Sequence, residues 1–196
     1  MYNSFRGIIV SYKREEMNYH NITKDDMLNG DGLRTVLWVS GCTHHCPGCQ
    51  NPITWDLAGG LPYDEDAEKE LFEALAKPHC SGITFSGGDP LHPFNREEVF
   101  RIAKKIRQEL PNKTIWLYTG FLWEEIKDIP EIADLDVVCE GKFVEALLDN
   151  KLLCRCLSVP MRLFLLGRCS KSLLYESPLT TKTSVHLLQN QWNFLS

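Results

Sequence analysis

Apolar positions in the first three quarters of the chain follow two different periods, one typical of strands and the other of helices. Short runs of β-branched and large apolar residues predict strands at residues 33–39, 82–85, 114–118 and 136–139. Apolar residues three and four positions apart predict helices at residues 66–76, 95–110 and 123–127. Asp64 and Asn95 are suited to cap the first two helices, because their side-chain oxygens can accept hydrogen bonds from first-turn amides.

The order of these elements indicates the fold class. Strands that alternate with helices form parallel sheets through right-handed crossovers, so we expect an α/β protein. Ligand sites on such sheets lie at the carboxyl ends of the strands. Three stretches directly follow expected strands: the loop that begins at Cys42, the pair Gly87 and Gly88, and the pair Thr119 and Gly120. The sequence therefore predicts that all three lie at one edge of the sheet.

Three cysteines lie close together in the loop after the first expected strand: Cys42, Cys46 and Cys49. Three thiolates can hold three irons of a cubane iron–sulfur cluster, whereas a cluster that only carries electrons usually has four cysteine ligands. The spacing therefore favours a 4Fe-4S cluster with these three ligands, in which the fourth iron is open to a reacting molecule.

Two alternatives remain open for this loop. His44 or His45 could join the cysteines in a structural zinc site, although such sites usually pair two short ligand segments across a longer spacer. Cys80 could also act as a fourth cluster ligand, which would close the open iron. Its remote position in the sequence favours a small buried residue instead.

A second motif ends the expected strand at residues 82–85. Gly87 and Gly88 follow it, and Asp89 and Pro90 complete the turn. Glycine has no Cβ, so its backbone can approach a ligand closely. An ordinary turn between a strand and a helix would have the same residues, and the motif alone does not decide between the two interpretations.

Taken together, the two motifs resemble those of the radical S-adenosylmethionine enzymes. That family has a Cys-x3-Cys-x2-Cys loop after its first strand and a Gly-Gly-Glu/Asp-Pro turn after its second. More narrowly, residues 17–148 resemble the group of activating enzymes that serve anaerobic ribonucleoside-triphosphate reductases. Further matching stretches are Asn51 and residues 29–34, 39–42, 54–55, 86–91, 115–120 and 140–143.

The resemblance implies an incomplete, open α/β barrel and an oxidoreductase reaction. An electron from the reduced cluster would break a C–S bond of S-adenosylmethionine. The resulting 5′-deoxyadenosyl radical would take a hydrogen from a glycine of the reductase and leave a glycyl radical there. The implied partners are that reductase and a flavodoxin-type electron donor.

The resemblance also implies roles for individual residues. The cluster ligands would be Cys42, Cys46 and Cys49. Backbone atoms of Gly87 and Gly88 would hold the methionine amino group, in a turn shaped by Asp89. The nucleoside would lie against Gly48, Cys49 and Gln50. Many family members have an aromatic residue beside the third cysteine that stacks on adenine; here the neighbours are Gly48 and Gln50, so backbone contacts or another side chain would have to hold the base.

The two parts of the chain differ in charge. Residues 1–150 hold fifteen basic and twenty-five acidic residues, a net charge of −10, whereas residues 151–196 hold six basic residues and one acid, a net charge of +5. This basic tail shows no sustained period and does not resemble the family, so we expect a domain at residues 17–150 followed by an atypical tail. A frame change in the gene and a genuine extension are both open explanations. Residues 1–16 are expected to be an N-terminal extension.

The composition narrows the classes of function. The acidic body argues against a nucleic acid partner, and no stretch approaches the roughly 20 apolar residues that span a bilayer. Clustered cysteines without a signal peptide fit a reducing, cytoplasmic compartment. Besides the activating enzyme, two functions stay open: a radical enzyme acting on a small molecule, and a non-enzymatic zinc or iron–sulfur binding module.

Overall fold

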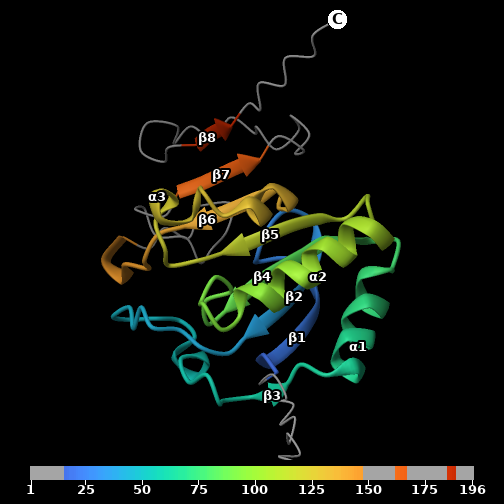
Figure 1. Cartoon of the computed structure of the whole chain (residues 1–196), viewed down its shortest axis with the longest axis horizontal. Coiled ribbons are helices and arrows are strands. Elements are labelled where there is room, and N and C mark those ends of the chain that lie inside the picture. Colours follow the sequence, from blue (N-terminus) through green and yellow to red (C-terminus); the bar gives the residue numbers. More distant parts are fainter. Residues whose placement is uncertain (1–15, 148–161, 167–184, 189–196) are drawn as a thin grey trace, which may run out of the picture.

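The computed structural model describes residues 16–147, 162–166 and 185–188. They form one mixed sheet of eight strands in the order β3-β1-β2-β4-β5-β6-β7-β8 (Figure 1). The strands are β1 (Asn18–Asp26), β2 (Leu33–Val39), β3 (Leu61–Pro62), β4 (Cys80–Gly87), β5 (Thr114–Tyr118), β6 (Val137–Glu140), β7 (Arg162–Leu166) and β8 (Val185–Leu188). The α-helices are α1 (Glu65–Leu75), α2 (Arg96–Glu109) and α3 (Trp123–Ile126), and short 3-10 turns occur at Pro52–Thr54, Pro130–Asp134 and Glu145–Leu147.

The centre of the sheet is parallel, as the sequence predicts. Strands β2, β4, β5 and β6 pair in parallel, with α1, α2 and α3 in the connections between them. The α/β class is therefore confirmed, and each expected strand and helix is present with its bounds shifted by a few residues at most. Asp64 caps α1 as expected, since its Oδ1 accepts a hydrogen bond of 3.0 Å from the Ala67 amide.

The outer strands differ from the purely parallel sheet that the sequence led us to expect. β1 pairs antiparallel with β2, and β3 pairs antiparallel with β1. Only residues 27–32 separate β1 from β2. Such a short connection can form a hairpin, whereas a parallel crossover needs a dozen residues or more. On the other side, β7 pairs antiparallel with β6, and β8 pairs parallel with β7.

Strands β7 and β8 lie in the basic tail, for which the sequence showed no sustained period. Their backbones extend the sheet beyond β6 (Figure 1). The other residues of the tail lie outside the described residues, as do residues 1–15 of the N-terminal extension expected at residues 1–16. The described residues include no helix with the length and apolar character needed to cross a membrane.

Alternation along the central strands separates two faces of the sheet. Leu37, Phe85 and Leu117 belong to a fully buried core that they share with apolar residues of α1 and α2. Successive side chains of a strand point to opposite faces. The intervening residues therefore face the other way, and among them Trp38 and Tyr118 line a cavity at the carboxyl ends of the strands.

Candidate functional site

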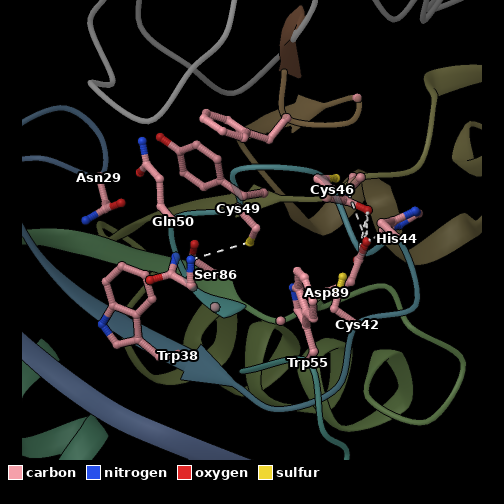
Figure 2. A pocket seen from close by; sticks show the side chains of 18 of the residues that line it. Asn29, Trp38, Cys42, His44, Cys46, Cys49, Gln50, Trp55, Ser86 and Asp89 are labelled. Carbon is pink, nitrogen blue, oxygen red and sulfur yellow. Dashed lines mark hydrogen bonds and ion pairs between the residues drawn. The ribbon is translucent and has the colours of Figure 1, made fainter. Parts of the chain in front are cut away.

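A cavity of about 500 Å³ lies at the carboxyl ends of the parallel strands (Figure 2). This size is typical of small-molecule sites. The loops after β2, β4 and β5 all contribute to it, so the predicted convergence of the three stretches is confirmed. The cavity is lined by Asp26, Leu28, Asn29, Trp38, Cys42, His44, Cys46, Cys49, Gln50, Asn51, Trp55, Ser86, Gly87, Gly88, Asp89, Tyr118, Thr119, Gly120, Gly141 and Phe143.

The three loop cysteines line this one cavity. Cys42, Cys46 and Cys49 are partly exposed and form no disulfide. Backbone hydrogen bonds hold both ends of the loop: the Cys42 amide donates to the Trp55 carbonyl at 3.0 Å, and the Cys49 amide donates to the Cys46 carbonyl at 3.1 Å. The Asn51 amide lies 3.4 Å from the Cys49 sulfur and donates to it. The loop thus presents three thiols from a backbone that is tied down.

The chemistry of these residues fits an iron–sulfur cluster. Burial raises the pKa of the Cys42 thiol above its ordinary value, but a bound metal removes that proton outright. Soft thiolates are the ligands that iron–sulfur clusters use. Trp55, which lines the same cavity, has a buried indole N–H without a hydrogen-bond partner among the described residues. Such a donor can serve a cluster sulfide, so the residues present fit the group.

Neither histidine of the loop is arranged as the zinc alternative requires. The Nε2 of His44 lies 2.7 Å from Asp89 Oδ2, and the ring of His45 packs on Trp55 with ring centres 4.8 Å apart. Within the described residues, no three or more His, Cys, Asp or Glu side chains gather around one metal-ion position. In a cubane, by contrast, each thiolate binds a different iron, so the three sulfurs need not converge on one point.

Cys80 lies at the other end of its strand from the cluster loop. It begins β4, whereas Gly87 ends that strand beside the cavity, and eight residues of strand span roughly 23 Å. The Cys80 side chain is buried within 3.5 Å of Thr35 Oγ1. A role as fourth ligand is therefore wrong on geometric grounds, and the interpretation as a small buried residue holds.

Gly87 and Gly88 bring the end of β4 against the cluster loop. A Cβ on Gly88 would lie 2.5 Å from the Gly41 carbonyl oxygen, and Gly87 has a φ of +102°. The Gly88 amide donates to the Val39 carbonyl at 2.8 Å, and the Asp89 amide donates to the Gly41 carbonyl at 2.8 Å. The lack of a Cβ therefore lets these two glycines pack closely against the backbone of residues 39–41. Both residues also line the cavity.

Asp89 is 1% exposed, and its carboxylate is surrounded by donors. Oδ1 accepts from the Leu91 amide at 2.8 Å and from Thr119 Oγ1 at 2.9 Å. Oδ2 accepts from the Gly120 amide at 3.0 Å and lies 2.7 Å from His44 Nε2. The predicted role of Asp89 in shaping the turn agrees with these contacts, which also reach the segment after β5 and the cluster loop.

The sequence-based interpretation of Asn95 was incomplete. Asn95 does precede α2, but its side chain makes no capping hydrogen bond. Instead its Nδ2 donates to the Ser40 carbonyl at 2.7 Å and to the Asp89 carbonyl at 3.0 Å. The side chain is fully buried at this junction, where it satisfies the carbonyl of the residue directly after β2 and a carbonyl of the turn after β4. It therefore supports the site instead of the helix.

The residues predicted to face a nucleoside are only partly brought together. Cys49 and Gln50 line the cavity, whereas Gly48 is not among its lining residues. A Cβ on Gly48 would overlap the carboxylate of Glu145, and Gly48 has a φ of +71°. Gly48 therefore fits a tight turn against Glu145.

Several lining residues were not singled out from the sequence. Trp38 lies on the same side of Cys49 as Asn29 and Gln50 (Figure 2), and its indole N–H donates to Thr23 Oγ1 at 2.7 Å. Tyr118 and Phe143 also line the cavity. The signal available for Trp38 and Tyr118 was strand alternation, because each lies next to a core residue near the carboxyl end of a predicted strand.

Comparisons with known proteins agree with this geometry. Residues 28–159 match the family described as the 4Fe-4S single cluster domain. The chain is 41% identical to the anaerobic ribonucleoside-triphosphate reductase-activating protein of Enterobacteria phage T4 over 136 residues, which cover 69% of this chain and 87% of that protein. It is 41% identical to the protein of the same name from Escherichia coli K12 over 143 residues, which cover 71% of this chain and 93% of that protein.

These matches decide between the alternatives that the sequence left open. A protein of the same name from Vibrio cholerae is 38% identical over 137 residues, which cover 68% of this chain and 88% of that protein. The family match confirms the predicted 4Fe-4S cluster and not the zinc site. The names of the relatives confirm the predicted enzyme and not a non-enzymatic binding module. The chain belongs to the family of anaerobic ribonucleoside-triphosphate reductase-activating proteins.

Proposed function

We propose that this chain cleaves S-adenosylmethionine reductively and abstracts a hydrogen from a glycine of an anaerobic ribonucleoside-triphosphate reductase, so that a glycyl radical remains on the reductase. The observation that carries the proposal is the meeting of three thiols with the Gly87 and Gly88 turn in one cavity. Among the described residues no fourth cysteine lines that cavity. The names of the relatives support the reductase as the target.

We assign the cluster to Cys42, Cys46 and Cys49. When bound, the cluster would supply one electron to the sulfonium, whose C–S bond then breaks to give methionine and a 5′-deoxyadenosyl radical. The chain itself supplies position and shelter from water. Trp55 and Phe143 wall the cavity, and a reactive radical needs such exclusion of solvent.

The cavity offers one side for each half of S-adenosylmethionine. Backbone atoms of Gly87 and Gly88 would hold the methionine amino group, near the cluster ligand Cys42. Cys49 and Gln50 would face the nucleoside. Trp38 lies on that side of the cavity and can supply the aromatic face that the cluster loop lacks (Figure 2). Its indole N–H is already bonded to Thr23, which fixes the plane of the ring.

The mouth of the cavity suits a polypeptide substrate. Leu28 lines the cavity and is 49% exposed, and its neighbour Met27 is 73% exposed. Apolar side chains at a rim favour contact with another protein surface. We assign this rim to the glycine-containing segment of the reductase.

Further parts of the proposal concern fold, partners and compartment. We infer that the parallel centre of the sheet is an incomplete, open α/β barrel, with residues 17–150 as the radical S-adenosylmethionine domain and residues 151–196 as an atypical tail. We also propose a flavodoxin-type protein as electron donor and the cytoplasm as the compartment. Its reducing conditions keep thiols available for a cluster.

The test is an anaerobic reaction. The reconstituted chain, S-adenosylmethionine, a reductant and a candidate reductase are mixed, and electron paramagnetic resonance is recorded. A glycyl radical that depends on all four components supports the proposal. Cleavage of S-adenosylmethionine without any glycyl radical, with reductases from several sources, would point instead to a small-molecule substrate.

A further inference from the structure

His44 lies between two cluster ligands, yet it is held by residues from other parts of the fold. Its side chain is only 10% exposed, and its Nε2 lies 2.7 Å from Asp89 Oδ2. Its ring packs edge-on against Phe121, with ring centres 4.7 Å apart and planes at 78°. The cluster loop is therefore attached through this one side chain to the turn after β4 and to the segment after β5.

The segment after β5 is shaped to receive the His44 ring. A Cβ on Gly120 would overlap that ring, so only glycine leaves the space it occupies. The Gly120 amide donates to the same Asp89 oxygen that faces His44, at 3.0 Å. Because a buried carboxylate must be satisfied by donors, Asp89, His44 and Gly120 form one unit in which each contact depends on the others.

The contacts of Asp89 also limit what that residue can do. Both of its oxygens accept hydrogen bonds from the protein, from Leu91, Thr119 and Gly120 as well as the contact with His44. A carboxylate so fully engaged is not placed to grip a ligand amino group directly. Its effect on a ligand would act through the position of the loop that carries the three thiols.

We propose that His44 and Asp89 are positioning residues. Their contact fixes the loop of residues 42–49 against the ends of β4 and β5, and so keeps the three thiolates aligned with the Gly87 and Gly88 turn. This inference rests on the proposed function, because the turn is where the amino group of S-adenosylmethionine is assigned. It predicts that loss of the contact uncouples cluster binding from S-adenosylmethionine binding.

The chain contains a matched control for this contact. His79 Nε2 lies 2.8 Å from Asp25 Oδ1, nearly the same distance as in the buried pair, but both side chains are about half exposed. His79 precedes β4 and is not among the residues that line the cavity. Removal of that pair should therefore change none of the properties measured at the cluster.

The experiment compares three variants of the full chain after anaerobic reconstitution with iron and sulfide. His44→Leu removes the contact with Asp89, His44→Gln keeps a donor of similar reach, and His79→Leu is the control. The readouts are iron and sulfide per chain, the electron paramagnetic resonance spectrum of the reduced cluster with and without S-adenosylmethionine, and the affinity for that ligand.

His44→Leu should still take up iron, but its affinity for S-adenosylmethionine should fall roughly tenfold or more, and the spectral change on adding the ligand should be reduced. The scale is taken from residues that support metal ligands from behind, whose removal typically costs about 10–100-fold in metal affinity or activity. His44→Gln should recover most of the affinity, and His79→Leu should match the original chain. A His44→Leu protein with unchanged affinity and spectral response would overturn the inference, even if its apo form melts at a lower temperature.

Two further measures keep the result decisive. If His44→Leu does not fold, Gly120→Ala displaces the ring without removing a hydrogen-bonding side chain, and it should give the same spectral defect. An unchanged spectrum for folded Gly120→Ala would then overturn the inference. If the original chain itself holds a cluster but does not respond to S-adenosylmethionine, the proposed function fails; an equal response in the original chain and in His44→Leu contradicts only the positioning role.

Discussion

The two sides of the cavity are built in different ways. On one side, Cys42 and His44 lie beside the buried carboxylate of Asp89 (Figure 2). That carboxylate also accepts hydrogen bonds from its own turn and from the segment after β5. On the other side, Trp38 presents an aromatic face held by its bond to Thr23, and Gln50 is an exposed residue that lines the cavity. The first side is suited to hold a charged inorganic group in a fixed place, and the second to receive an organic ligand that enters and leaves.

The largest expected effect comes from removing a thiol on the first side. Cys46→Ser should abolish a stable 4Fe-4S cluster, because a hydroxyl is a poor substitute for a thiolate ligand to iron. Iron and sulfide content and the visible colour of the reconstituted protein measure this. Cys80→Ser is the control: it should keep a normal cluster, and a colourless Cys80→Ser protein that still folds would refute our assignment of ligands.

The second side is tested by its aromatic face. Trp38→Leu should weaken binding of S-adenosylhomocysteine by about 1–3 kcal/mol, the range for loss of an aromatic partner that stacks on a base. Trp38→Phe should retain most of the affinity, and neither change should alter iron content. Calorimetric titration gives the affinities. Equal affinities for Trp38→Leu and the original chain would move the adenine away from Trp38.

A smaller effect is expected at the rim. Leu28→Ser should weaken association with the reductase by about 1 kcal/mol, because a half-exposed leucine gains roughly that much when it is buried on docking. Cleavage of S-adenosylmethionine in the absence of the reductase should be unchanged. If Leu28→Ser lowered cleavage in the absence of the reductase as much as it lowered association, Leu28 would belong to the ligand site and not to the docking surface.

A substitution far from the cavity should affect the site least and change only the stability of the fold. Asp64→Ala should lower the free energy of unfolding by about 1 kcal/mol, because it removes the cap of α1. Urea denaturation of the apo protein measures this. Asp66→Ala, in the first turn of the same helix, should lose only a few tenths of a kcal/mol. Either change should leave cluster content and ligand affinity as they were.

The sequence predicted the parallel centre of the fold well, because its strands and helices have clear periods. It also predicted that the cysteine loop, the Gly87 and Gly88 turn and the Thr119 and Gly120 pair would meet, since all follow parallel strands. It did not predict β1, whose polar and apolar residues do not alternate regularly; its burial varies between exposed and buried along the strand. β1 is defined by its pairing with β2, and such pairing is not visible in local sequence.

The supporting contacts of the site were the least predictable part. Asn95 and His44 have obvious local interpretations, as a helix cap and as a metal ligand. Their actual partners, Ser40 and Asp89 for Asn95 and Asp89 for His44, are separated from them by up to 55 residues, and only the tertiary fold brings them together. Asp89 shows the same limit, since its partners at Thr119 and Gly120 come from a different strand end.

The central claim is that one iron of the cluster has no ligand from the protein. Mössbauer spectroscopy of the reconstituted chain, recorded before and after addition of S-adenosylmethionine, tests it most directly. The account predicts that the signal of one iron site changes when the ligand binds, while the signals of the other irons stay the same. A complete cluster whose iron signals all remain unchanged at saturating ligand would contradict it.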